Sequence, residues 1–242
     1  MKNILTLALL FCSAIWLTGQ EMKPEETEVW SPEPAIVTPG MNGAPPSDAI
    51  VLFDGTSLDN WQHADGSAAK WKLEDGAMVA QKGAGDVFTR EKFTSCQLHI
   101  EWRTPSKVEG EGQGRGNSGI FLQGIYELQV LDSYDNRTYS NGQAGSIYKQ
   151  TMPLVNASKG PGEWQVYDII YHAPTFNSGH EYETHPYITV FHNGVLIQDH
   201  TKIQGTTPYI GPPKVNQHGS GPLRLQDHNN PTAFRNIWIR RL

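Results

Sequence analysis

From Ala49 to Leu242 the chain consists of short apolar or alternating runs separated by turn residues. Asn193-Gly194, between "ITVFH" and "VLIQ", is the pair typical of a two-residue β-hairpin turn of type I′. Past the first twenty residues, no segment carries a helical i, i+3, i+4 stripe longer than two turns. These patterns predict an all-β, antiparallel fold of about eleven to fourteen strands, arranged as a two-sheet β-sandwich.

The first residues are typical of an export signal. Lys2 supplies the positive charge, Ile4 to Trp16 form an almost wholly apolar run, and Thr18-Gly19-Gln20 place small residues near a cleavage point. The apolar run is shorter than the roughly 20 residues that span a membrane, and no later segment comes close. We therefore predict a signal peptide at residues 1–20, no transmembrane span, and an exported protein that is periplasmic or extracellular.

A lipid anchor on Cys12 is disfavoured, because Phe11 stands where a bacterial lipobox requires a small residue. Cys96 is the one other cysteine, so the mature chain forms no internal disulfide. Residues 21–48 are rich in Pro, Glu and Thr, which predicts an extended segment that is either a strap packed on the domain or a free linker. Trp30 and Ile36-Val37 favour the strap, because a free linker gains nothing from exposing apolar side chains. Residues 49–242 are expected to form one domain.

The net charge of the chain indicates which kinds of partner it can bind. The formal net charge is −6 and the isoelectric point is about 5.8, so no basic field exists to collect phosphates. Nucleic acid is therefore not expected as a partner. A neutral substrate fits this composition better.

Three strands carry unusual polar faces, because side chains alternate between the two faces of a strand. The polar faces comprise His99, Glu101 and Arg103 in "LHIEWR", Glu127 and Gln129 in "YELQVLD", and Arg224, Gln226 and His228 in "LRLQDH". Such a face could be a solvated surface, but it lacks the Lys and Thr common there. If the three strands share one sheet, their carboxylates, guanidinium groups, amides and imidazoles would line a groove suited to the hydroxyls of a sugar.

Several familiar hydrolase arrangements do not match. A retaining glucanase would place two acids about 5 Å apart, yet the residue two positions after Glu127 is Gln129, which cannot ionise. No Gly-x-Ser-x-Gly nucleophile motif occurs. The segment "HEYETH" has one residue too many between its histidines for a zinc-protease helix.

Six segments appear in an order that resembles the 3-keto-disaccharide hydrolase domain family. They are "VLFDGTSLDNWQ", "LEDGAMVA", "NSGIFLQGIYELQVLDSY", "GSIYKQTMPLVNASKGPGEWQVYDIIYHAP", "VFHNGVLIQDHT" and "GPLRLQDHNNPTAFRNIWIRRL". The resemblance covers nearly the whole mature chain and implies a concanavalin A-like jelly roll. It also implies cleavage of glycosides whose C3 has been oxidised by a separate upstream sugar 3-dehydrogenase.

This implied chemistry needs three groups. A ketone at C3 acidifies the proton on C2 and places the glycosidic oxygen on C1 for elimination. The enzyme then needs a base near C2, a group that holds the enediolate oxygen at O3, and an acid for the leaving oxygen. Water adds to the enone for net hydrolysis, or the enone departs as a lyase product.

On this resemblance we expect Glu127 or His228 to be the base, and Arg103 or Arg224 to stabilise the enediolate. Glu101 is expected to be the second carboxylate. The expected sugar contacts and rim residues are Asn117, Gln129, Gln226, Tyr148 and Lys149. A divalent cation such as Ca²⁺ or Mn²⁺ could take the place of an arginine.

Three other functions stay open at this point. A sandwich with aromatic residues such as Trp61, Trp71 and Trp164 could bind carbohydrate without catalysis. The chain could also be an ordinary glycoside hydrolase that acts on unoxidised glucan, or a structural or adhesion domain.

Overall fold

The computed structural model describes residues 22–242, so the predicted signal peptide lies outside the described residues. The described chain falls into two units, one that ends at Ile36 and one that comprises Val37–Leu242. In the described part of the first unit, one turn of 3₁₀ helix, η1 (Pro24–Thr27), begins with a proline whose fixed φ suits the first helical position. Of the helices formed by residues 22–242, none is both long enough and apolar enough to cross a membrane.

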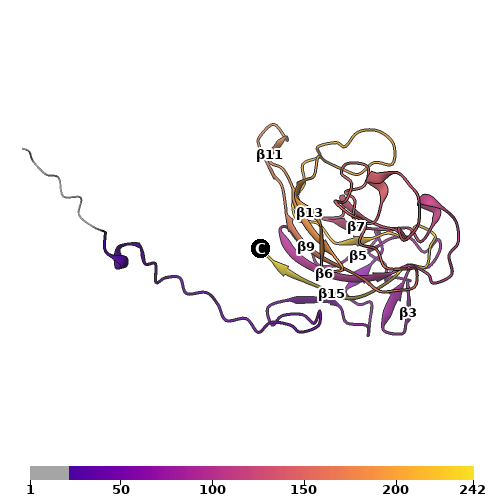
Figure 1. The fold of residues 1–242 in the computed structure, drawn as a ribbon, viewed down its shortest axis with the longest axis horizontal. Coiled ribbons are helices and arrows are strands. Elements are labelled where there is room, and N and C mark those ends of the chain that lie inside the picture. The colour runs from indigo at the N-terminus through magenta and orange to yellow at the C-terminus, as the bar shows by residue number, and fades with distance from the viewer. Residues whose placement is uncertain (1–21) are drawn as a thin grey trace, which may run out of the picture. The chain divides into compact units, whose positions relative to one another are not determined.

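The second unit is an antiparallel β-sandwich (Figure 1). Its larger sheet has eight strands in the order β13-β12-β9-β6-β15-β4-β3, with β1 also paired to β15. The bounds are β1 Ile50–Phe53, β3 Lys72–Glu74, β4 Ala77–Val79, β6 Cys96–Arg103, β9 Gln165–His172, β12 Tyr187–His192, β13 Val195–Lys202 and β15 Ala233–Arg241.

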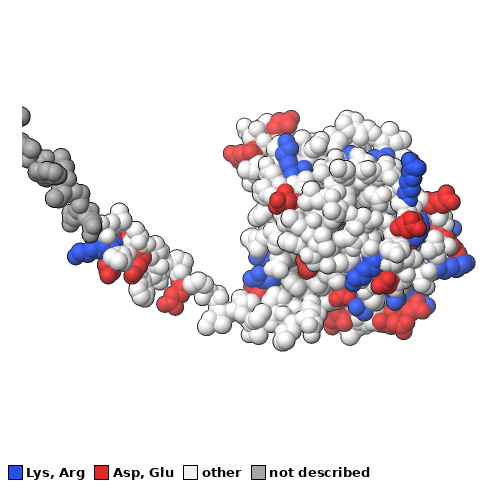
Figure 2. Space-filling view, in the orientation of Figure 1, with Lys and Arg blue, Asp and Glu red and all other residues white. Residues whose placement is uncertain are grey.

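The smaller sheet has five strands in the order β2-β5-β14-β7-β8. Its bounds are β2 Trp61–Gln62, β5 Val87–Thr89, β7 Ser118–Leu122, β8 Tyr126–Val130 and β14 Arg224–Leu225. A separate hairpin joins β10 (Thr175–Phe176) to β11 (Tyr182–Thr184), and short 3₁₀ turns lie at η2 (Gly112–Gly114) and η3 (Ser140–Gly142). Positive and negative side chains are interspersed over the visible face of the sandwich (Figure 2).

The core lies between the two sheets because their strands alternate apolar and polar side chains. Facing residues of β6 and β8 are almost fully buried: Leu98, Ile100, Trp102, Tyr126, Leu128 and Val130. The sheets are also joined by a polar contact, since the Tyr167 hydroxyl on β9 donates to the Gln129 carbonyl on β8 at 2.9 Å. Burial of these large side chains supplies the main driving force for folding.

The predicted all-β, two-sheet antiparallel sandwich is confirmed. Residues 22–242 form fifteen strands, one more than the upper expectation, because two-residue strands such as β2 and β10 escape a search for longer runs. Asn193 and Gly194 both have positive φ, 53° and 81°, as a type I′ turn requires, and they join β12 to β13.

Of the predicted strap or linker, residues 37–48 lie across the outer face of the eight-stranded sheet and are called the strap from here on. Trp30 and Ile36 are 80% and 99% exposed and do not support a strap over residues 22–36. The Gly43 carbonyl accepts hydrogen bonds from Asn236 Nδ2 and Trp238 Nε1, both at 2.9 Å. Gly43 has φ of 81°, and a Cβ there would lie 3.2 Å from the ring of His99. A glycine therefore lets the strap lie close to the sheet.

Candidate active site

The polar side chains of the five-stranded sheet lie in two rows across adjacent strands. Antiparallel register pairs Phe121 of β7 with Glu127 of β8 on one side and with Arg224 of β14 on the other. In the second row Gly119 pairs with Gln129, and the Gly119 carbonyl accepts a hydrogen bond from the backbone of Gln226 at 3.0 Å. Two strand spacings of roughly 4.8 Å separate the outer members of each row.

These rows form the floor of a hollow of about 240 Å³. The hollow is lined by Asn117, Phe121, Glu127, Gln129, Tyr148, Thr207, Tyr209, Arg224, Gln226 and His228. Seven of these ten are residues that we singled out from the sequence. The volume lies below the ~300 Å³ at which pockets for drug-sized ligands begin, so it suits a single sugar ring.

Gly119 creates the depth of the hollow. A Cβ at this position would lie 2.8 Å from Glu127 Oε1 and 2.8 Å from a ring carbon of Phe121. Because Gly119 has no side chain, the Glu127 carboxylate leans over the β7 backbone.

Glu127 is a buried acid, with 7% of its surface exposed. Burial raises the pKa of Glu127 to about 8; the positive charge of Arg224 opposes this rise and the negative charge of Asp86 adds to it. At pH 7 most Glu127 side chains are then protonated, and a minority are ionised. This carboxyl group can therefore both take up and release a proton near neutral pH.

The Gln129 amide lies beside the Glu127 carboxyl group. Turned one way, its nitrogen donates to Gln113 Oε1 at 2.9 Å. Turned the other way, its nitrogen donates to Glu127 Oε1 at 3.1 Å. The second orientation also lets the nitrogen donate to the Ser118 carbonyl at 3.1 Å, and it gives the Glu127 carboxylate a hydrogen-bond donor.

Arg224 is held rigidly at the opposite side of the hollow. Its Nε and Nη2 both lie 2.6 Å from Asp86 Oδ2, and its guanidinium carbon lies 4.1 Å above the Phe121 ring. The pairing with Asp86 and the stacking on Phe121 leave part of the guanidinium facing the hollow.

The rim comes from irregular segments. The Tyr148 backbone N–H donates to the Glu127 carbonyl at 3.2 Å, and the Glu127 N–H donates to the Thr207 hydroxyl at 3.2 Å. These bonds also cover the free edge of β8. Lys149 lies behind the rim, where its ammonium donates to the Tyr209 carbonyl, and His228 is exposed at the mouth.

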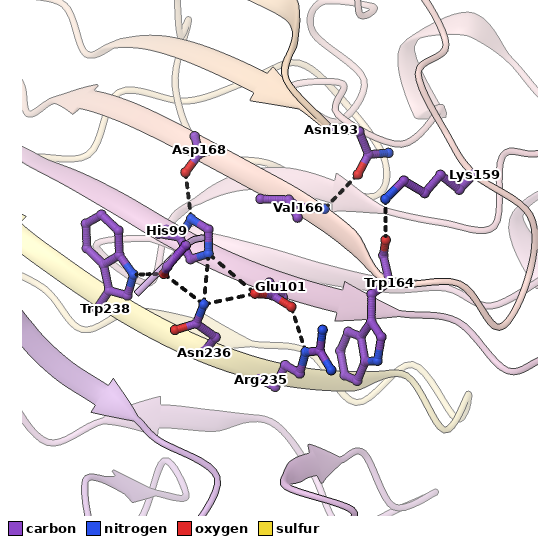
Figure 3. Close-up of polar contacts among 11 residues, drawn as sticks. His99, Glu101, Lys159, Trp164, Val166, Asp168, Asn193, Arg235, Asn236 and Trp238 are labelled. Atoms are coloured by element: carbon purple, nitrogen blue, oxygen red, sulfur yellow. Dashed lines mark hydrogen bonds and ion pairs between the residues drawn. The ribbon is translucent and has the colours of Figure 1, made fainter. Parts of the chain in front are cut away.

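The expectation that Glu101 and Arg103 share this hollow is wrong. Both lie on β6, which belongs to the eight-stranded sheet between β9 and β15. Glu101 binds Arg235 Nε at 2.6 Å and Asn236 Nδ2 at 2.9 Å beneath the strap (Figure 3). Arg103 lies 4.7 Å from the centre of the Trp164 ring. Alternation along β6 correctly groups these side chains on one face, but that face belongs to the other sheet.

His99 occupies the centre of the cluster in Figure 3. Its Nδ1 lies 2.6 Å from Asp168 Oδ1, its Nε2 lies 3.7 Å from Glu101 Oε1, and its ring stacks on Trp238. Burial alone would lower the pKa of His99, but hydrogen bonds to Asp168 and Glu101 outweigh it and raise that pKa to about 9. Burial alone would raise the pKa of Glu101, but His99, Asn236 and Arg235 lower it to about 2.

A second hollow, of about 660 Å³, lies between this cluster and the strap. Its polar groups are largely paired with one another. Arg240, for example, forms a two-bond contact with Asp48 and also donates to Gln97 at 2.9 Å. Charges that are neutralised within the protein indicate a joint that fastens the strap rather than a reactive site.

The five-stranded-sheet hollow offers few metal ligands. Glu127 is its one carboxylate and His228 its one imidazole, with the amide oxygens of three Asn and Gln side chains in the same lining. Among residues 22–242 no three His, Cys, Asp or Glu side chains gather around one point. The residues present do not make up a cation site by themselves. Dependence on Ca²⁺ or Mn²⁺ stays a prediction.

Some residues of the hollow were not singled out from the sequence. Phe121 follows Asn117 and Gly119 in strict alternation, so its position on the polar face was readable, but an aromatic residue in a strand suggests core. Thr207 and Tyr209 lie in the irregular segment between β13 and β14, which has no periodicity to indicate where its side chains point.

An antiparallel jelly-roll sandwich with an acid, a guanidinium group and amides in a hollow the size of one sugar is typical of carbohydrate-active proteins. The sequence profile of the 3-keto-alpha-glucoside-1,2-lyase-like domain matches residues 48–240. The chain therefore belongs to this family, which confirms the resemblance found in the sequence.

Three crystal structures from Parabacteroides distasonis ATCC 8503, each provisionally described as a glycosyl hydrolase, share the fold. One is 55% identical to this chain. Its alignment covers 91% of this chain and 97% of that chain, with a TM-score of 0.89. The second is 19% identical, and its alignment covers 80% of this chain and 94% of that chain with a TM-score of 0.59. The third is 20% identical, and its alignment covers 80% of this chain and 99% of that chain with a TM-score of 0.56. No protein of curated function matches the chain. Family and fold together make this a carbohydrate-active enzyme of the glycosyl hydrolase or lyase type.

The cluster around His99 should make stability depend on pH. Since the folded-state pKa of His99 is raised from 6.5 to about 9, its contribution is fully present below pH 6.5 and is lost as the pH rises through 9. The pKa of Glu101 is lowered from 4.5 to about 2, so Glu101 contributes its full stabilisation of the folded state above pH 4.5. Melting temperatures between pH 6 and pH 9.5 should therefore fall more steeply for the wild type than for His99→Gln. His172→Gln, on the exposed face of β9, should keep the wild-type slope, and equal slopes for all three proteins would contradict the assignment.

Proposed function

We propose that this enzyme cleaves the glycosidic bond of 3-keto glycosides, including 3-keto disaccharides, by removing the C2 proton and eliminating the C1 substituent. The observation that carries the proposal is the pair of Glu127 and Arg224 at opposite sides of one sugar-sized hollow. A buried carboxyl with a pKa near 8 is matched to taking a proton from carbon beside a ketone.

The reaction needs both groups at once. Glu127 takes the proton from C2, and electron density moves to O3 as the enediolate forms. The Arg224 guanidinium, fixed by Asp86 and by the Phe121 ring, supplies positive charge and hydrogen bonds to that oxygen. Because Arg224 is already held in place, little reorganisation is required when the charge develops.

The amides of the hollow suit the remaining hydroxyls of the sugar. Asn117 is 4% exposed and its nitrogen donates to the Gln113 carbonyl at 2.7 Å, which leaves its oxygen free to accept. Gln226 lies beside Gly119 at the floor. Among the described residues that line the hollow, Glu127 is the single carboxylate, so a double displacement between two acids has no second partner there.

The chemistry of the proposed substrate indicates which reaction must form it. A 3-keto glycoside arises by oxidation of the C3 hydroxyl of an ordinary glycoside, so a sugar 3-dehydrogenase must act first. Export of this enzyme, as the N-terminal sequence predicts, would place the cleavage step outside the cytoplasm.

The substrate class is tested by incubating the protein with p-nitrophenyl 3-keto-glucoside and with p-nitrophenyl glucoside, and following nitrophenol after subtraction of the buffer rate. We expect turnover of the oxidised glycoside alone, because only its C2 proton is acidified. Cleavage of the parent alone would indicate an ordinary glycosidase. Binding of both without release would indicate a carbohydrate-binding domain, and either result would overturn the proposal.

The role of Glu127 is tested by the pH dependence of kcat/KM. Because Glu127 acts as a base only when ionised, kcat/KM should rise with pH through about 8. Glu127→Gln should lower kcat about 100-fold or more and remove that rise. A rate that falls as the pH rises through 8 would instead identify Glu127 as an acid and contradict its role as the base.

Gly119→Ala should damage the site without replacing any of the reacting groups. The added methyl group would displace the Glu127 carboxylate, and such a misplacement costs roughly 100-fold in rate. Gly114→Ala is the matched control, because a Cβ at Gly114 meets no atom within 4 Å. Equal rates for both variants, measured with the oxidised glycoside, would show that the close approach at Gly119 is dispensable.

A further inference from the structure

Tyr148 lies directly beside Glu127, and Tyr139 contacts the Tyr148 hydroxyl. An isolated bridge pairs Leu128 with Ile147, and both are buried in the core. Alternation then turns Tyr148 to the same side as Glu127, and its side chain lines the hollow. The backbone bond from Tyr148 N–H to the Glu127 carbonyl, 3.2 Å long, fixes this arrangement.

The Tyr148 hydroxyl is connected to solvent through Tyr139. The two hydroxyl oxygens are 2.7 Å apart, and Tyr139 is 40% exposed. Burial raises the pKa of Tyr148, and Tyr139 and the negative charge of Glu127 raise it further. Burial also raises the pKa of Tyr139. Both phenols are therefore protonated at neutral pH, so Tyr148 can give a proton and Tyr139 can replace it.

A cation faces the same pair. The Lys149 ammonium lies 4.2 Å from the centre of the Tyr209 ring, 5.6 Å from that of Tyr148 and 5.8 Å from that of Tyr139. Its bond to the Tyr209 carbonyl holds it there. A fixed positive charge at this distance favours the negative charge that Tyr148 carries after it has given up its proton.

We propose that Tyr148 is the acid that protonates the leaving glycosidic oxygen, with Tyr139 as its link to solvent. This inference rests on the proposed function. In the elimination Glu127 gains the C2 proton, the C1–O bond breaks, and the departing oxygen takes the Tyr148 proton. In the hydration the Tyr148 phenolate takes a proton from water while the water oxygen bonds to C1, and Glu127 returns its proton to C2. Both residues end in their starting states, and the net reaction is hydrolysis.

The other groups of the hollow fit this role less well. Glu127 has just taken the C2 proton, and the Arg224 guanidinium does not release protons in proteins. His228 is exposed at the mouth, and within the described chain no hydrogen bond orients its ring. Tyr148 is oriented, protonated and adjacent to the base.

The test compares two leaving groups in Tyr148→Phe. A methyl 3-keto-glucoside releases methanol and needs a proton donor, whereas p-nitrophenol departs as the anion. We expect Tyr148→Phe to lower kcat for the methyl glycoside about 100-fold or more and to change kcat for the nitrophenyl glycoside less than about tenfold. Tyr139→Phe should lower the methyl rate by a smaller factor. Melting temperatures close to that of the wild type establish that both variants fold.

Exchange of the C2 hydrogen in D₂O, followed by NMR, separates this inference from the proposed function. Tyr148→Phe should still exchange C2 hydrogen of the methyl glycoside, whereas Glu127→Gln should not. A wild type that neither exchanges nor cleaves would overturn the proposed function itself. If the wild type both exchanges and cleaves, the role of Tyr148 can be judged separately. That role alone would be overturned if Tyr148→Phe cleaved both glycosides at the wild-type rate, or if it lost the exchange of C2 hydrogen. Leaving-group dependence that appears in His228→Asn instead would assign the acid to His228.

Discussion

The register of β7 between β8 and β14 is the constraint on which the candidate active site depends. It aligns Glu127, Phe121 and Arg224 in one row across three strands. A slip of one residue would turn Glu127 or Arg224 into the core, where Leu128 and Leu225 now lie at 1% and 0% exposure. Burying either charge there would be costly, because the core offers no partners for it. The apolar residues on one face thus fix the positions of the polar residues on the other.

Two glutamates in similar polar surroundings acquire opposite properties. Glu101 binds Arg235 and Asn236 and lies beside His99, and these partners lower its pKa. Glu127 forms no ion pair within 4 Å among the described residues, and burial raises its pKa. A carboxylate whose charge is neutralised inside the protein fastens segments together. One that is buried without such neutralisation is ready to exchange a proton with a ligand.

The sequence predicted the fold and most of the hollow for the same reason. Alternation shows which side chains share a face, and for Glu127, Gln129, Arg224 and Gln226 those faces lie in one sheet. It does not show strand order, so β6 was wrongly grouped with them, and Glu101 was taken to lie in the hollow. Thr207 and Tyr209 were missed because irregular segments have no period. The raised pKa of Glu127 depends on the depth of burial, which no local pattern records.

On the proposed reaction, one set of residues serves both a hydrolase and a lyase. Elimination and hydration are the same step in opposite directions, with either an alcohol or water as the partner of C1, so Glu127 and Tyr148 act in both. The product then depends on whether water enters before the enone leaves. Thr207 and Tyr209 form one wall of the hollow, and the bond from Lys149 to the Tyr209 carbonyl holds that wall against the rim. In the proposed reaction, a wall fastened in this way would slow the escape of the enone and give water time to add.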